Sequence, residues 1–299
     1  MEQTHGTSRP DSRAEASDPR LYQILSLGTL LTYGLVWLHF SVSCLQIVVT
    51  IGAALLTQYV ATRLARLPVF DPTSALISSL SLCLLLRTND LAVSAAAAVL
   101  TISSKFLVRW RHKHVFNPTN LALAVVLGTG LGWVSPGQWG QVAWCGFLIA
   151  CLGTLVVTRA ARADVTLAFL SFYVGLLTSR ALWLGDPLTI PLHQLESGAL
   201  LIFAFFMISD PKTTPDSRAG RIIYALCVAL IAGYVQFGLF RPHGPLWGLI
   251  VCAPLVPLID AWLPGRRNEW PDRSSGHVPP VTLIPLRHSV SIPQPRRFS

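Results

Sequence analysis

The sequence predicts an all-α fold, a polytopic membrane bundle of about ten transmembrane helices. Hydrophobic residues make up 52% of the 299-residue chain and charged residues 12%, whereas an ordinary soluble domain has about 25% charged residues. The apolar residues also come in repeated long runs, many of them near the ~20 residues that span a bilayer as a helix. Because runs of this length do not alternate with polar residues, only helices can satisfy their own backbone groups in lipid.

Each apolar run is bounded by polar or charged residues, by glycine or by proline. The two runs 72–86 and 195–209 are shorter than a typical span. We expect a membrane domain over residues 22–262 and disordered cytoplasmic tails over 1–21 and over the basic, Pro/Ser-rich 263–299. The ten runs are 22–40, 41–62, 72–86, 91–108, 117–135, 142–158, 165–184, 195–209, 222–240 and 246–262.

The basic residues predict the orientation. With ten crossings, 20 of the 23 Lys and Arg residues fall on the side of the two tails, and only Arg87, Arg180 and Arg241 fall on the other. Cytoplasmic loops are enriched in Lys and Arg. We therefore expect a multi-pass protein of the cell membrane with both termini in the cytoplasm.

Several function classes are excluded by residues that the sequence lacks. The net charge of +9 is spread over the cytoplasmic segments without a nucleic-acid-binding motif, so no nucleic-acid partner is expected. The six cysteines show no metal-ligand spacing, and we predict no metal site. Neither Gly-x-Ser-x-Gly nor His-Glu-x-x-His is present, which argues against a hydrolase.

An Asx-Pro pair recurs at three predicted helix ends on the cytoplasmic side. Asp71-Pro72 begins the third span, Asn117-Pro118 begins the fifth and Asp210-Pro211 follows the eighth. Asn or Asp before a proline is typical of an N-cap followed by the first helical residue. Helix N-termini also attract anions and carbonyl groups, so the motifs favour either a binding site or ordinary capping.

The eighth span favours a binding site over ordinary capping. Its aromatic-rich run, residues 198–208, leads through Ser209 directly to Asp210-Pro211. A short span that ends in this way is typical of a broken helix that lines a binding site. We expect Asn117-Pro118-Thr119 and residues 210–213 to meet at the cytoplasmic end, with Lys105 and Lys212 giving a positive potential suited to an anionic or electron-rich ligand.

These segments resemble a known family. HVFNPTNLALAV (114–125), GALLIFAFFMISDPKTTPDSRAGRIIYAL (198–226) and PLVPLIDAW (254–262) are similar to the D subunit of the Rnf electron-transport complex and the B subunit of the sodium-pumping NADH:quinone oxidoreductase. The resemblance implies two inverted five-helix repeats and flavin-linked electron transfer. Shorter relatives occur among membrane proteins of enediyne antibiotic clusters, which this compact chain resembles more.

One family feature is missing. Relatives carry FMN on a threonine of a Ser-Gly-Ala-Thr motif between spans 5 and 6, but here that loop (132–141, GWVSPGQWGQ) has no threonine. We therefore expect no covalent FMN. The resemblance implies a second, non-covalent flavin (riboflavin or FMN), for which the candidate ligands are Lys105, Asn117, Thr119, Asp210, Lys212, Thr213 and Arg221. Phe116, Phe205 and Phe206 are candidates for stacking on it, although packing alone also explains them.

The sequence leaves two functions open. The first is a flavin-related electron-transfer subunit that works with other membrane or redox subunits, or an accessory protein of enediyne-type biosynthesis. The chain has no nicotinamide fingerprint and no cluster-binding cysteine set, so a redox role needs an external donor. The alternative is a transporter or membrane scaffold without redox activity. No catalytic residue is assigned.

Overall fold

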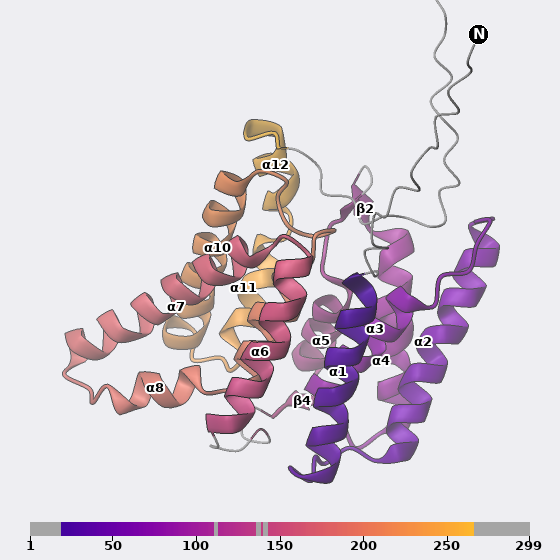
Figure 1. Ribbon diagram of the computed structural model, residues 1–299, viewed down its shortest axis with the longest axis horizontal. Helices are drawn as coiled ribbons and strands as arrows, with labels where there is room; N and C mark the ends of the chain where they lie inside the picture. Colours follow the sequence, from indigo (N-terminus) through magenta and orange to yellow (C-terminus); the bar gives the residue numbers. More distant parts are fainter. Residues whose placement is uncertain (1–18, 111–112, 136–138, 140–142, 266–299) are drawn as a thin grey trace, which may run out of the picture.

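The structure is a computed structural model that describes residues 19–110, 113–135, 139 and 143–265. The described part is a bundle of helices with two short antiparallel strand pairs near its ends (Figure 1). The predicted tails lie almost entirely outside the described residues, although the first helix already begins at Pro19 rather than at residue 22.

Each of the ten apolar runs contains helix, as predicted. An additional short helix, α8, occupies the segment before the eighth run, where the sequence had not predicted a helix. The helices are α1 (Pro19–Val36), α2 (Cys44–Leu64), α3 (Thr73–Leu85), α4 (Leu91–Leu107), α5 (Pro118–Thr129), α6 (Ala143–Arg159), α7 (Ala163–Leu184), α8 (Thr189–Leu195), α9 (Gly198–Ile202), α10 (Arg218–Gly233), α11 (Gly244–Cys252) and α12 (Leu255–Trp262). Two π-helical turns, η2 (Phe203–Met207) and η3 (Tyr234–Gly238), continue α9 and α10.

Judged by length and composition, fewer helices qualify as membrane crossings than the sequence predicted. Among the described residues, α2, α7 and α10 with η3 are long and apolar enough to cross a membrane. Two bent pairs, α8 with α9–η2 at 53° and α11 with α12 at 55°, raise the count to five if each is one span. The remaining apolar helices are shorter, so ten crossings stays a prediction.

The helices of the two halves of the chain pair in the same order. In the first half α1 packs on α3, α2 on α4, and α4 on α5. In the second half α6 packs on α9, α7 on α10, and α10 on α11. The halves meet where α1 contacts α6 and α5 contacts α11. The first, fifth, sixth and tenth runs therefore form the contact between the halves.

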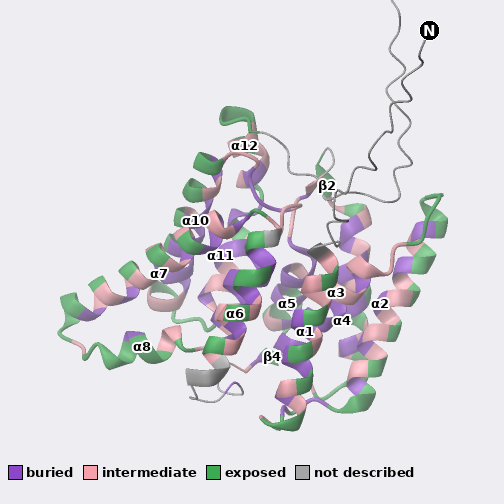
Figure 2. Ribbon diagram, in the orientation of Figure 1, coloured by how far each residue is buried: buried purple, intermediate pink, exposed green. Residues whose placement is uncertain are grey.

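Small residues allow the close contacts in this middle region. A Cβ on Gly248 of α11 would lie 2.6 Å from the carbonyl oxygen of Val228 on α10. A Cβ on Gly153 of α6 would lie 2.4 Å from Cγ of Phe205, whose ring fills that space. Small residues at helix contacts are common in membrane proteins because they let backbones approach. Large apolar side chains are left on the outside instead, for example Leu56, Leu167 and Trp183. Figure 2 shows exposed residues along the outer helices α2, α7 and α8.

The strands mark the two ends of the bundle. β1 (Leu86–Arg87) pairs with β4 (Trp133–Val134) at one end, and β2 (Arg109–Trp110) pairs with β3 (Lys113–His114) at the other (Figure 1). Arg87 is fully buried and donates to the carbonyl oxygens of Cys83, Leu84 and Leu86, which closes the C-terminal end of α3. The β2–β3 end carries the motifs that the sequence singled out.

Candidate functional site

Asn117 joins two of the three Asx-Pro motifs. Its side-chain Oδ1 accepts the N–H of Asn120 at 3.1 Å and so caps α5, with Pro118 at the first helical position. Its Nδ2 donates to the carbonyl oxygen of Met207, the last residue of η2, at 3.2 Å. The side chain is 7% exposed. The start of the fifth run and the end of the eighth therefore meet, as the sequence predicted.

Asp210 orders the turn that follows η2. Its Oδ1 accepts the backbone N–H of Lys212 at 2.9 Å, and its carbonyl oxygen accepts the N–H of Thr213 at 3.1 Å. This Asx-turn is the role that the sequence predicted for Asp210. Burial raises the pKa of Asp210, while the Lys212 N–H and the positive charges of Lys212, Lys105 and Arg162 oppose that rise.

Lys105 reaches the site from the last turn of α4. Its Nζ donates to the carbonyl oxygen of Ser74 at 2.7 Å and to Ser74 Oγ at 3.0 Å. The residue is 5% exposed. An ammonium group has three N–H donors, and two of them are used by Ser74 at the start of α3. The third has no acceptor among the described residues, and Lys105 lines the adjoining cavity.

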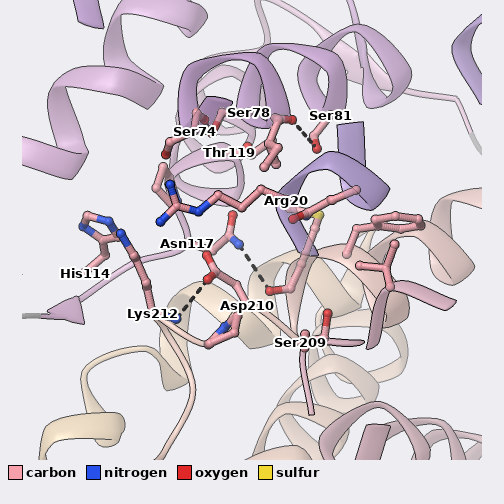
Figure 3. A pocket seen from close by; sticks show the side chains of 18 of the residues that line it. Arg20, Ser74, Ser78, Ser81, His114, Asn117, Thr119, Ser209, Asp210 and Lys212 are labelled. Atoms are coloured by element: carbon pink, nitrogen blue, oxygen red, sulfur yellow. Dashed lines mark hydrogen bonds between the residues drawn. The ribbon is translucent and has the colours of Figure 1, made fainter. Parts of the chain in front are cut away.

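The remaining Asx-Pro motif ties α1 to α3. Asp71 accepts the N–H of Thr73 through Oδ1 at 3.0 Å, and its Oδ2 pairs with Nη1 of Arg20 at 2.7 Å. Arg20 stands in the first turn of α1. Figure 3 shows its long side chain crossing the cavity close to Asn117. Three helix starts, those of α1, α3 and α5, thus converge on one place.

His114 contributes a neutral imidazole. Its backbone N–H donates to the carbonyl oxygen of Lys212 at 3.2 Å, which attaches β3 to the Asp210 turn. Burial, followed by the charges of Lys212, Arg109 and Lys105, lowers the pKa of His114 to about 3. The ring is therefore uncharged near neutral pH. Its buried Nδ1 has no hydrogen-bond partner among the described residues.

A polar cavity of about 80 Å³ lies between these elements. Five of the seven predicted ligand residues line it: Lys105, Asn117, Thr119, Asp210 and Lys212. Of the aromatic residues predicted to stack on a ligand, Phe206 lines the cavity, whereas Phe205 is buried against Gly153. The wall combines cationic groups, the carboxylate of Asp210, and amide and hydroxyl groups (Figure 3), with apolar side chains such as Phe206 beside them.

The other two predicted residues lie elsewhere. Thr213 is 3% exposed and donates from Oγ1 to the carbonyl oxygen of Asp210 at 3.3 Å, within the turn. Arg221 binds Asp164 through Nε and Nη2 at 2.5–2.9 Å and the Asp216 carbonyl oxygen at 2.7 Å. Arg221 thereby joins α10 to α7, so the structure gives it a contact role and does not bring it to the cavity.

The sequence did not predict several residues of the wall, in particular Arg20, Ser74, Ser78 and His114. Arg20 was assigned to the tail, yet it follows another Asx-Pro pair, Asp18-Pro19, and α1 begins at Pro19. The serines of α3 share one face at helical spacing with Ser81, which is a polar stripe inside an apolar run. Nothing in the sequence distinguished His114 from the other basic residues of its loop.

Comparison with known proteins decides the family. A model of the NQR2, RnfD, RnfE family matches residues 90–268, more than half of the chain. The chain belongs to the NQR2, RnfD, RnfE family. This confirms the resemblance that the sequence motifs indicated, and together with the apolar helices it identifies a membrane protein. The match includes Lys105, Asn117 and the Asp210 turn.

Among the curated relatives in the NQR2, RnfD, RnfE family are proteins named as the D subunit of an ion-translocating oxidoreductase complex. The one from Erwinia tasmaniensis is 29% identical over 137 residues, covering 46% of this chain and 36% of the relative. Those from Citrobacter koseri and Escherichia coli O1:K1 are 32% and 33% identical over 132 residues, covering 44% of this chain and 35% of each relative. The chain thus spans about a third of the length of these relatives.

Proposed function

We propose that this chain is a membrane electron-transfer subunit that holds a non-covalent flavin in the cavity between Asn117 and the Asp210 turn. The observation that carries the proposal is the convergence of the α1, α3 and α5 starts on the C-terminal end of α9–η2, the second part of the bent pair that begins at α8. Helix starts present N–H groups to electron-rich ligands. Irregular backbone inside a membrane bundle is tolerated where it lines a cavity.

The donor set suits the electron-rich edge of a flavin. Lys105 has one N–H without an acceptor among the described residues, and Lys212 adds positive charge. The Nδ1 of the neutral His114 also lacks a partner among the described residues and can accept an N–H of the ring. A bound flavin would supply the capacity to accept and release electrons. A cavity of about 80 Å³ holds several water molecules. A ring system needs more room, so its binding requires Arg20 and Lys212 to move, with the Arg20–Asp71 ion pair opened.

Two observations favour partner subunits: the redox motifs missing from the sequence and the names of the relatives. Its sequence has no nicotinamide fingerprint and no cysteine set for an iron–sulfur cluster. The curated relatives are named as subunits of an ion-translocating oxidoreductase complex. We propose that other membrane or redox subunits deliver and remove the electrons. The repeated pairing order of the two halves supports an arrangement as two inverted five-helix repeats.

Flavin content after purification tests the proposal. The wild-type chain in detergent should carry flavin that acid or detergent denaturation releases, measured by absorbance and chromatography. Asn117→Ala and Asp210→Ala should lose most of it, whereas Ser43→Ala, which removes the cap of α2 outside the site, should retain it. A colourless wild-type protein that binds neither added riboflavin nor added FMN would refute the flavin role.

A transporter or scaffold without redox activity is the second candidate. It is favoured by the segment Gly198–Met207, which lines this cavity with Phe206 and Met207 and a second cavity with Leu200 and Phe203. This segment is the second part of the bent pair that begins at α8, and binding sites formed by discontinuous helices are typical of alternating-access proteins. An accessory role in natural-product biosynthesis of the enediyne type fits either function, and uptake into proteoliposomes separates transport from electron transfer.

A further inference from the structure

The face that α2 turns toward the other helices is polar, although the helix lies in an apolar bundle. The exposed positions of α2 carry large apolar side chains, for example Val48, Leu56 and Val60. Polar residues within a membrane domain usually face the bundle interior and often mark a pathway. The buried residues of α2 recur at every fourth position, and four of the five are polar: Gln46, Thr50, Ala54, Gln58 and Thr62.

Polar side chains of α4 lie on the side of that helix that meets α2. The two helices pack together, and Gln46 Nε2 donates to Ser94 Oγ across the contact at 3.0 Å. Thr101 and Lys105 follow Ser94 by about two and about three helical turns, so all three share one face. We call the following set of side chains the α2–α4 seam: Gln46, Thr50, Gln58, Thr62, Ser94, Thr101 and Lys105.

The bond between Gln46 and Ser94 fixes the depth of the other seam residues. Both helices run from the β1–β4 end to the β2–β3 end of the bundle (Figure 1). The same number of residues along each helix leads from this bond to Gln58 on α2 and to the neighbour of Lys105 on α4. Because the rise per residue is the same in both helices, Gln58 and Lys105 lie at about the same depth. Thr62 is one turn nearer the β2–β3 end, and Thr101 is one turn deeper.

The part of the seam toward the β1–β4 end is closed by bonds within the protein. Gln46 uses its Nε2 on Ser94, and Thr50 donates from Oγ1 to the carbonyl oxygen of Gln46 at 2.7 Å. The next buried position of α2 is Ala54, whose side chain is a methyl group. The polar groups of this part therefore satisfy one another.

The part toward the β2–β3 end contains buried polar atoms without partners. Gln58 Oε1, Thr62 Oγ1 and Thr101 Oγ1 have no hydrogen-bond partner among the described residues. They make up three of the eight buried side-chain atoms of this kind in the part of the chain that the structure describes, so such atoms gather in the seam. Burial of a polar atom without a hydrogen bond is costly, and ordered water is the usual partner where the protein supplies none.

Lys105 connects this part of the seam with the cavity at Asn117. Its Nζ donates to the carbonyl oxygen and to Oγ of Ser74 at 2.7 and 3.0 Å, and its third N–H has no acceptor among the described residues. Lys105 is buried and lines the cavity, whereas Gln58, Thr62 and Thr101 do not line it. Lys105 therefore belongs both to the seam and to the cavity wall.

We propose that the part of the seam from Thr62 to Thr101 holds a file of water molecules that carries protons to Lys105 from the β2–β3 end, which the basic residues predict to be cytoplasmic. When the Lys105 ammonium gives a proton to a group in the cavity, the resulting amine takes a proton from the nearest water, and bulk water restores it through the file. The path ends below Thr101, because the deeper polar groups are bonded to one another. It does not depend on flavin as the occupant of the cavity.

Hydrogen exchange at single cysteines tests the proposal. In the full chain without its native cysteines, held in lipid nanodiscs, the infrared S–H band of one introduced cysteine decays to S–D after transfer to D₂O. We expect Gln58→Cys and Thr101→Cys to exchange about tenfold faster than Thr50→Cys, since exchange needs contact with water. Thr50 is equally buried, but it lies in the closed part of the seam. Equal rates at the three positions, whether fast or slow, would overturn the proposal.

A variant that blocks the start of the path separates it from entry through the cavity. Thr62→Leu puts a larger, apolar side chain at the β2–β3 end of the seam, so it should slow the exchange of Gln58→Cys and of Thr101→Cys severalfold. Val60→Leu adds volume on the exposed face of α2 and should leave both rates unchanged. Rates are compared only among variants with the helix content and elution of the parent, and either cysteine suffices if the other does not fold. Exchange that stays fast in Thr62→Leu would show that protons do not enter along the seam.

Discussion

The side-chain amide of Asn117 bonds at both ends, to the N–H of Asn120 through Oδ1 and to the Met207 carbonyl oxygen through Nδ2 at 3.2 Å. The first bond caps α5 within one half of the chain. The second holds the end of η2, which belongs to the other half. The carbonyl of Met207 lies at the end of a helix, where the last carbonyl groups lack partners within the helix. One residue therefore serves local folding and the joining of two distant segments.

Substitutions at Asn117 should separate these two roles. Asn117→Asp keeps the capping oxygen but removes the donor to Met207, whereas Asn117→Ala removes both. We expect Asn117→Ala to lower the free energy of unfolding by about 2 kcal/mol, from about 1 for the cap and about 1 for the buried hydrogen bond. Ser43→Ala, which removes the cap of α2 alone, should cost about 1 kcal/mol. SDS titration followed by circular dichroism measures the differences; equal losses for Asn117→Ala and Ser43→Ala would contradict the second role.

The neutral imidazole of His114 predicts an acid-sensitive fold. The pKa of His114 is about 3 in the folded chain against an ordinary value of 6.5. Below pH 6.5 the unfolded chain binds a proton that the folded chain does not, so stability falls as the pH is lowered from about 6.5 toward 3. Above that range His114 is neutral in both the folded and the unfolded chain, so its titration no longer changes the stability. In His114→Gln the decline should be shallower, as read from thermal unfolding at a series of pH values. The matched control, His39→Gln at an exposed position, should keep the wild-type slope.

The pair formed by Arg221 and Asp164 predicts a stability effect that leaves the cavity intact. Both side chains are mostly buried, with exposures of 11% and 17%. Arg221→Met should destabilise the protein by about 3 kcal/mol, because Asp164 keeps a buried charge without its partner. The double variant Arg221→Met with Asp164→Leu should regain much of that loss. Flavin bound per folded molecule should equal that of the wild type in both variants, and a selective loss of flavin would place Arg221 in the site after all.

The absence of threonine from the loop 132–141 predicts that no flavin is covalently attached to the chain. It contains no threonine, and the family linkage uses a threonine hydroxyl at that place. Intact-mass spectrometry of the purified protein should give the mass of the bare polypeptide, about 32.6 kDa. A mass increase equal to FMN attached through a phosphodiester would contradict this expectation, even if the cavity at Asn117 also holds a free flavin.

The distribution of Lys and Arg predicts which end of the bundle faces the cytoplasm. In a background without native cysteines, single cysteines can replace Trp110 of β2, which is 57% exposed, and Phe240 after η3, which is 84% exposed. A maleimide that cannot cross the membrane should label intact cells at position 240 and not at position 110. The reverse result would invert the orientation and place the cavity at Asn117 on the outer face.

The sequence by itself determined the helical fold class and the ten apolar runs in which helices form, although not α8. Long apolar runs bounded by charges, glycine and proline leave little freedom in where a membrane helix begins or ends. It also determined the cap formed by Asn117 and the turn at Asp210, because both are bonds between residues two or three positions apart. Family membership was readable for the same reason, since the segments that carry it are contiguous.

Only the tertiary structure decided which residues share a cavity. Arg20, Ser74 and His114 come from three separate elements, and no spacing rule relates them to Asp210 along the chain. The same applies to Arg221, whose sequence context suggested a ligand but whose guanidinium is taken by Asp164. Contacts between residues far apart in the sequence depend on which helix faces pack together. In an apolar bundle, small residues such as Gly153 and Gly248 determine where two helices can approach closely. Hydrophobicity places a helix in the membrane, whereas shape and a few buried polar bonds choose its neighbours.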